Sequence, residues 1–183
     1  ANTLILSDST SDMFITANYG VLDIKTHRLV YSSAGHNLAL HAPAVGAQLN
    51  DLTAGGLALG IIDDIELEQK TVDLEPGDVV LFYTDGAIDT LNPAGEEFGD
   101  ERLAELLARH KAEPAEAIAA AIDAAVHTWA AGESQYDDFT LIVIRRKTPE
   151  EKEAFDGESE DSAQPETVGA RHVSVRRAAG HLH

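Results

Sequence analysis

The sequence reads VVLFYTDG at residues 79–86, and this stretch decides the fold class. Val79 to Tyr83 form a continuous apolar run, which is typical of a strand buried on both faces. Such a strand needs a layer of structure on each side, so the run predicts a layered domain. The run leads through Thr84 straight into Asp85-Gly86, which places an acidic side chain at the end of a buried strand.

Strand patterns occur mostly before this stretch, and helix patterns occur after it. One helix is predicted from Asp100, which suits an N-cap, and another from Pro114 to Gly132. Strands followed by helices and one closing strand predict an α+β layered fold. The expected strands are residues 14–23, 29–33, 37–41, 65–70, 79–83 and 139–144.

Composition and charge restrict the class of protein. The 183 residues include 32 acidic and 13 basic side chains, a net charge of -19, which argues against a nucleic-acid partner. The absence of cysteine excludes disulfides, thiolate metal sites and cysteine nucleophiles. The sequence has no apolar run of about 18 residues and no signal-like N-terminus, so we expect no membrane segment in this chain and a cytoplasmic location.

The sequence divides into a body and a tail. Residues 1–147 contain the strand and helix patterns, whereas residues 148–183 have few large apolar side chains and many charged ones. Such a segment cannot bury enough apolar surface to offset the entropy of ordering. Residues 148–183 are therefore predicted to be a disordered acidic tail.

Acidic residues at two strand ends are the first candidates for chemistry. Asp85 follows the apolar run, and Asp137 and Asp138 directly precede the strand predicted at 139–144. If these strands are neighbours, the carboxylates converge on one rim, which suits a hard ion such as Mg²⁺ or Mn²⁺. From spacing alone the alternatives stay open, because Asp-Gly is also a common turn and Asp-Asp a common solvated loop.

Several segments, which follow one another in order along the sequence, carry a resemblance to a known family. Together they resemble the PPM-type metal-dependent protein phosphatases, specifically the SpoIIE/RsbU branch of bacteria. The segments are MFIT (13–16) with YGVLD (19–23), SAGHN (33–37), GLALGI (56–61), LEPGDV (74–79), LFYTDG (81–86), NPAGEEFG (92–99) and DDFTL (137–141).

The resemblance implies a fold, a cofactor and a reaction. It implies a partial α-β-β-α sandwich, two antiparallel sheets flanked by helices, with two Mn²⁺ or Mg²⁺ ions in the complete domain. The implied reaction is hydrolysis of phosphoserine or phosphothreonine by a metal-activated water. Asp85 and Asp137 match catalytic metal ligands, and Asp138 is the neighbour to test next. His36 is either an acid or phosphate contact or, as is common for a Gly-His turn, a structural residue.

The resemblance also implies a substrate and a catalytic segment that is expected upstream of this sequence. The implied substrate is a phosphorylated bacterial regulatory protein, an anti-sigma-factor antagonist of the STAS type, with an upstream sensor domain possible. The family's bridging carboxylate belongs to a Gly-Asp segment upstream of Ala1, so residues 1–147 are expected to be the C-terminal portion of the domain. Activity of this chain by itself is therefore in question. The alternatives are a truncated or degenerate, non-catalytic interaction module and an acidic domain without a site.

Overall fold

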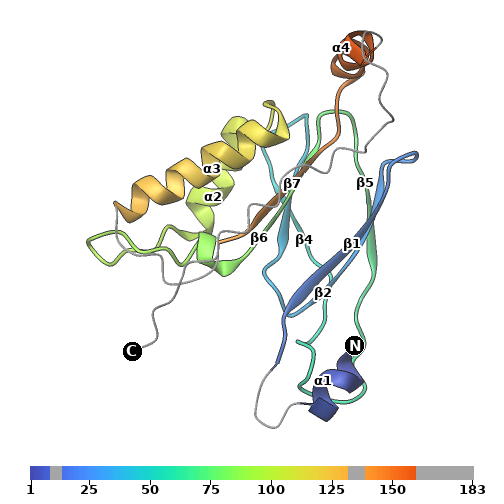
Figure 1. Cartoon of the computed structure of the whole chain (residues 1–183), viewed down its shortest axis with the longest axis vertical. Coiled ribbons are helices and arrows are strands. Elements are labelled where there is room, and N and C mark those ends of the chain that lie inside the picture. Colours follow the sequence, from blue (N-terminus) through green and yellow to red (C-terminus); the bar gives the residue numbers. More distant parts are fainter. Residues whose placement is uncertain (9–13, 132–138, 160–183) are drawn as a thin grey trace.

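The computed structural model describes residues 1–8, 14–131 and 139–159. Within them, the strands form two antiparallel sheets, one with the order β1-β2-β5 and one with the order β4-β3-β6-β7 (Figure 1). The strands are β1 (Ala17–Asp23), β2 (Arg28–Ala34), β3 (Ala39–Ala42), β4 (Asn50–Leu52), β5 (Lys70–Asp73), β6 (Val79–Tyr83) and β7 (Leu141–Arg145).

Strand β6 is the centre of the four-stranded sheet, as its apolar sequence predicts. It pairs with β3 on one side and with β7 on the other. Val79, Val80 and Leu81 are fully buried, because both faces of the strand are covered. Leu81 packs with the residues under the helices, whereas Val80 packs with residues of the other sheet.

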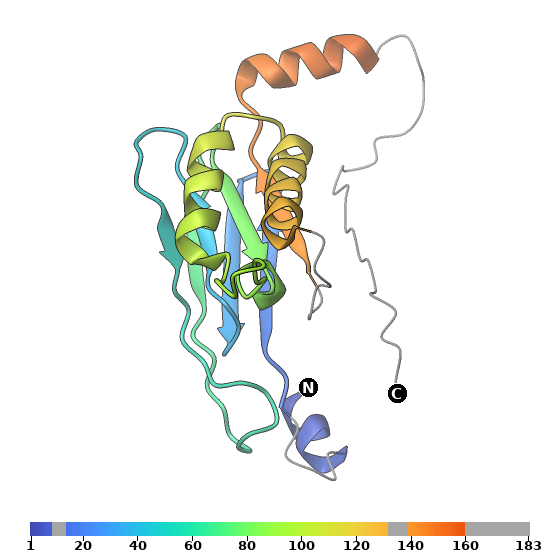
Figure 2. The same cartoon turned by 90° about the vertical axis from the view of Figure 1, so that its left-hand side faces the viewer.

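Two helices cover the outer face of the four-stranded sheet (Figure 2). They are α2 (Gly99–His110) and α3 (Ala115–Ala130), which lie side by side and contact each other. Leu103 and Leu107 of α2 and Ile118 and Ile122 of α3 are fully buried. The apolar side chains of both helices therefore face the sheet, as amphipathic helices require.

A second core lies between the two sheets. Leu29 and Tyr31 of β2 pack there with Leu52, Leu74 and Val80. Val21 and Tyr19 alternate to the other face of β1, where their side chains are 51% and 70% exposed. The molecule therefore has a helix layer, a four-stranded sheet and a three-stranded sheet, which is the layered α+β architecture predicted from the sequence.

The structure corrects two of the predictions and adds one strand. Residues 65–69 are not a strand; β5 instead runs over Lys70–Asp73, where it pairs with β2. The Glu68 side chain and backbone instead bond the backbone of Gly55, which holds this segment as a loop. The three-residue strand β4 was not predicted. Asp100 is not the N-cap of α2, because the helix already begins at Gly99.

The Pro-Gly-Asp turn before β6 is fastened by a buried carboxylate. Asp78 is 4% exposed and accepts hydrogen bonds from the backbone N–H groups of Ala44 (2.8 Å) and Glu75 (3.0 Å). Its Oδ2 also lies 2.9 Å from Nε2 of His41 on β3. Burial alone would raise the pKa of the Asp78 carboxyl, but these hydrogen bonds outweigh it and the net pKa lies below the ordinary value.

Helices at the two ends complete the described part. Helix α1 (Asn2–Asp8) lies near the start of β1, and α4 (Pro149–Ser159) lies at the opposite end (Figure 1). Helix α4 falls in a segment whose composition predicted no order. Its first turn is held by Glu151, which accepts hydrogen bonds from the Thr148 N–H (2.8 Å) and from Arg145 (2.7 Å). Disorder of residues 160–183 stays a prediction, since they lie outside the described residues. No helix in the described ranges is long and apolar enough to cross a membrane.

Candidate functional site

The local backbone brings Asp85 to the surface at the end of β6. Thr84 continues the extended strand, and the chain then turns into the short 3₁₀ helix η1 (Asp85–Ala87). The Asp85 carbonyl accepts the N–H groups of Ile88 and Asp89, both at 2.8 Å. Gly86 is buried, whereas Asp85 is exposed, and its Oδ1 accepts the Gly86 N–H at 3.1 Å. The predicted position of this carboxylate at a strand end is therefore what the structure shows.

The strand that follows Asp137 and Asp138 lies directly beside this turn. Tyr83 of β6 is paired with Leu141 of β7. Beyond that pair, the Thr84 N–H donates to the Thr140 carbonyl (3.1 Å), and the Thr140 N–H donates to Oγ1 of Thr84 (3.0 Å). The condition set by the sequence, that the two strands are neighbours, is therefore met.

The two acids themselves lie outside the described residues. Thr140 stands two and three positions after Asp138 and Asp137 in the sequence and contacts the residue before Asp85. The convergence of the three carboxylates on one rim stays a prediction.

The ability of this rim to hold a metal can be judged from its donors. Asp85 offers an exposed carboxylate, the ligand type that Mg²⁺ and Mn²⁺ prefer, and so fits one ligand of such an ion. Within residues 1–8, 14–131 and 139–159, no group of three or more His, Asp or Glu side chains is placed to hold an ion. A set of three or more such ligands that includes Asp85 would therefore need residues from outside those ranges.

A buried tyrosine links the end of β6 to helix α2. The Tyr83 hydroxyl donates to Oδ1 of Asp100 at 3.0 Å. Burial, with the nearby Asp100 carboxylate, raises the pKa of the Tyr83 phenol well above its ordinary value. The phenol therefore stays protonated and acts as a donor that fixes the strand end, a role for Asp100 that the N-cap pattern did not reveal.

The loop after η1 is also held in place. Thr90 is buried and donates from Oγ1 to the Gly86 carbonyl at 2.7 Å. Further along, Trp129 of α3 donates from Nε1 to the Glu96 carbonyl at 3.1 Å, and the Arg102 guanidinium lies 4.1 Å from the centre of the indole ring. Trp129 also packs against the core, and its contact with this loop had no sequence signal.

His36 lies in the turn between β2 and β3. Its Nδ1 is 3.0 Å from Oγ1 of Thr16, and its carbonyl accepts the Ser33 hydroxyl at 3.3 Å. Gly35 before it has φ = 65°, and a Cβ there would lie 3.0 Å from the backbone N of Ala58. These contacts favour the structural interpretation of His36 over that of an acid or phosphate contact.

Comparison with known proteins gives the family and close relatives. The family model described as Stage II sporulation protein E (SpoIIE) matches residues 1–147. The phosphoserine phosphatase RsbU of Bacillus subtilis is 30% identical over 154 residues, which cover 80% of this chain and 43% of RsbU. Protein IcfG of Synechocystis sp. is 31% identical over 134 residues, 73% of this chain and 21% of IcfG. The chain thus spans less than half the length of these curated relatives.

Solved structures agree with the fold. The SiaA-PP2C domain of Pseudomonas aeruginosa superimposes with a TM-score of 0.68 at 23% identity, covering 79% of this chain and 57% of that one. The phosphatase domain of the cell fate determinant SpoIIE of Bacillus subtilis, presoaked with Mn, gives 0.58 at 20% identity, covering 79% and 63%. The two antiparallel sheets and their helices are therefore those of this phosphatase fold. With the match over residues 1–147, the chain belongs to the SpoIIE family of PPM-type phosphatase domains.

Proposed function

We propose that this chain is the C-terminal portion of a metal-dependent protein phosphatase that hydrolyses phosphoserine or phosphothreonine on a bacterial regulatory protein. The observation that carries the proposal is the pairing of Thr84 with Thr140, because it joins the segment that ends in Asp85 to the segment that follows Asp137 and Asp138. The homology to the phosphoserine phosphatase RsbU supports the chemistry.

In this proposal Asp85 and Asp137 are metal ligands, with Asp138 as the neighbouring candidate. Mn²⁺ or Mg²⁺ bound there would supply Lewis-acid stabilisation of phosphoryl oxygens and activation of a water. The described residues supply the support. The Gly86 N–H orients Oδ1 of Asp85, and the Thr84–Thr140 pair fixes the ends of the two strands.

The proposed substrate is a phosphorylated regulatory protein, of the STAS anti-sigma-factor antagonist type that the family resemblance implies. The relationship to RsbU supports a phosphoserine substrate. Trp129 and Arg102 donate hydrogen bonds to backbone carbonyls of residues 96–98 in the loop that follows the site, so this loop offers a fixed surface against which such a protein could dock.

The test is Mn²⁺-dependent release of phosphate from a phosphoserine regulator by the protein as encoded. Asp85→Asn and Asp137→Asn are each expected to lower kcat/KM at least about a hundredfold, because loss of one charged ligand removes much of the electrostatic stabilisation. Comparison of Asp138→Asn with Asp137→Asn shows which of the two neighbouring acids is the ligand. The matched control is Asp123→Asn on the exposed face of α3.

Two outcomes would overturn the proposal. Unchanged turnover in Asp85→Asn and Asp137→Asn would remove both residues from the site. No Mn²⁺-dependent turnover with retained binding of the regulator would support the non-catalytic interaction module instead.

A further inference from the structure

A pocket of about 580 Å³ lies at the end of the sandwich opposite to Asp85. Strand β6 connects the two places, because Val79 at its start pairs with Arg145 beside the pocket and Tyr83 at its end precedes Asp85. Four residues of strand separate them, about 13 Å at about 3.3 Å per residue. The pocket is therefore not part of the candidate phosphatase site.

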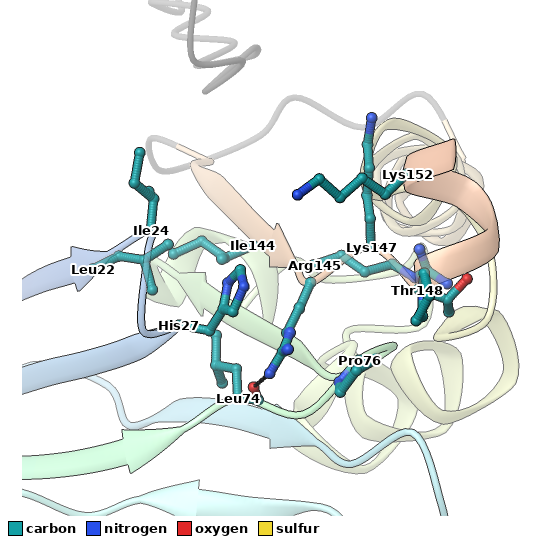
Figure 3. Close-up of a pocket in the computed structure, with 12 residues that line it drawn as sticks. Leu22, Ile24, His27, Leu74, Pro76, Ile144, Arg145, Lys147, Thr148 and Lys152 are labelled. Atoms are coloured by element: carbon teal, nitrogen blue, oxygen red, sulfur yellow. Dashed lines mark hydrogen bonds between the residues drawn. The ribbon is translucent and has the colours of Figure 1, made fainter. Parts of the chain in front are cut away.

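One side of the pocket is apolar. Leu22 of β1 and Ile144 of β7 come from the edge strands of the two sheets and pack against the core between them. Ile24, in the turn after β1, is 54% exposed, and Leu74 is buried beneath. Figure 3 shows Leu22 and Ile24 on one side of the pocket, with Ile144 between them and the basic residues. An apolar body could cover this side and remove it from water.

The other side of the pocket is cationic, so its charge is opposite in sign to the net charge of the chain. Four of the thirteen Lys and Arg residues line the pocket, together with His27, and the described lining contains none of the 32 acidic residues. Figure 3 shows Lys147 and Lys152 on the side of α4, away from Leu22 and Ile24. In a chain with a net charge of -19, this is a local site for an anion.

The basic residues differ in how far they are already engaged. Arg145 is neutralised by Glu151, with Nη1 and Oε2 2.7 Å apart, and its side chain is only 7% exposed. Arg146 donates to the Leu74 carbonyl, a neutral acceptor. Among the acidic residues of 14–131 and 139–154, whose side chains the structure describes, none forms an ion pair with Arg146 or Lys152, so both charges can be offered to a ligand.

We propose that this pocket binds a small amphiphilic anion, a molecule with one carboxylate or phosphate head and an apolar body. The head lies against Arg146 and Lys152, and the body covers Leu22, Ile24 and Ile144. The volume is within the range of about 300–1,000 Å³ that is usual for small-molecule sites. Since the pocket adjoins both β7 and α4, such a ligand would join the sandwich to the segment that follows residue 147.

The test is calorimetric titration of the protein as encoded with four probes. Decanoate and decyl phosphate carry the two possible heads, decanol carries the same body without charge, and inorganic phosphate is a head without a body. At least one charged amphiphile is expected to bind one to one and at least tenfold more tightly than decanol or phosphate, and the tighter of the two identifies the head. Equal affinity for decanol, or no binding of either amphiphile, would overturn the proposal.

Variants locate the binding. Lys152→Gln and Ile24→Ser change exposed side chains, so the fold should persist, and each is expected to weaken binding about three- to tenfold. Arg109→Gln on α2 removes one exposed positive charge elsewhere and should leave binding unchanged. If Lys152→Gln had no effect, or Arg109→Gln an equal one, the site would not be this pocket. Binding is measured without turnover, so the result is independent of the proposed phosphatase activity.

Discussion

At the scale of single residues, the buried carboxylate of Asp78 shows how one side chain can fix a strand. It satisfies two backbone N–H groups and the ring of His41 at once, which joins the β5–β6 turn to the chain after β3. A buried donor that loses its acceptor retains its desolvation penalty. The turn that starts β6 therefore depends on this carboxylate.

Asp78→Asn is expected to lower the free energy of unfolding by about 2–4 kcal/mol, because one of its oxygens becomes an amide NH₂ and a buried donor loses its partner. Urea unfolding measures this loss. The control is Asp123→Asn on the exposed face of α3, for which a change within about 0.5 kcal/mol is expected. Equal stability of the two variants would show that the buried network contributes nothing.

The same residue gives a pH dependence. Its pKa in the folded state lies below the ordinary value of 3.8, so the carboxylate stabilises the fold above about pH 3.8. This contribution is lost as the pH falls through the folded pKa, since the proton then binds the folded form as well. The stability difference between wild type and Asp78→Asn should therefore shrink as the pH falls below about 3.8. A difference that grew as the pH fell would contradict the assignment.

The position of a residue could be predicted from the sequence where the pattern that determines it is local. Asp85 stands at the end of a buried strand, as the abrupt change from apolar run to Asp-Gly predicted. Asp100 was given the wrong role, because its partner Tyr83 is 17 residues away and no spacing rule reveals such a contact. The choice between the two interpretations of His36 likewise needed the hydroxyl of Thr16, 20 residues away in the sequence.

At the scale of elements, the close contact between the loop at Gly56 and strand β2 is a place where only glycine fits. A Cβ at residue 56 would lie 2.3 Å from the Ser33 carbonyl oxygen, which belongs to the backbone and cannot rotate away. A Cβ at the neighbouring Gly55 would be 3.6 Å from its nearest atom, the Glu68 carboxylate, an ordinary contact.

Gly56→Ala is therefore expected to destabilise the fold by about 1–3 kcal/mol through forced displacement of the loop or of β2. Gly55→Ala is the matched control, with an expected change of less than about 1 kcal/mol in either direction. Thermal or urea unfolding of the two variants decides the matter. A Gly56→Ala protein as stable as Gly55→Ala would mean that the loop does not pack on β2 as described.

Elements were predicted well where periodicity or a long apolar run decides them. The strand predicted at 65–70 is wrong for residues 65–69. Glu68 hydrogen-bonds to the backbone of Gly55, and the pairing of β5 with β2 begins only at Lys70. Helix α4 was missed for a related reason. Composition indicates how much apolar surface a segment can bury. It does not show that the Glu151 carboxylate accepts hydrogen bonds from both the Arg145 side chain and the Thr148 N–H.

At the scale of the whole molecule, the order of strands and helices was enough to predict layers, and the resemblance predicted their identity. Two antiparallel sheets face each other, and helices cover the four-stranded one, as in the solved phosphatase domains of the family. The cationic pocket could not be predicted, because its residues come from the end of β1 with the β1–β2 turn, from the β5–β6 turn, and from the segment that joins the end of β7 to the start of α4. Only the folded sandwich brings these three segments together.

The central claim is that the rim beside Asp85 holds the metal of a phosphatase, and a crystal of the protein as encoded, soaked in Mn²⁺, tests it most directly. Anomalous scattering locates manganese without any assumption about activity. The account predicts a manganese ion with carboxylate oxygens of Asp85 and Asp137 about 2.0–2.3 Å away, and loss of that peak in Asp85→Asn. A manganese peak that excludes Asp85, or one that persists unchanged in Asp85→Asn, would contradict it.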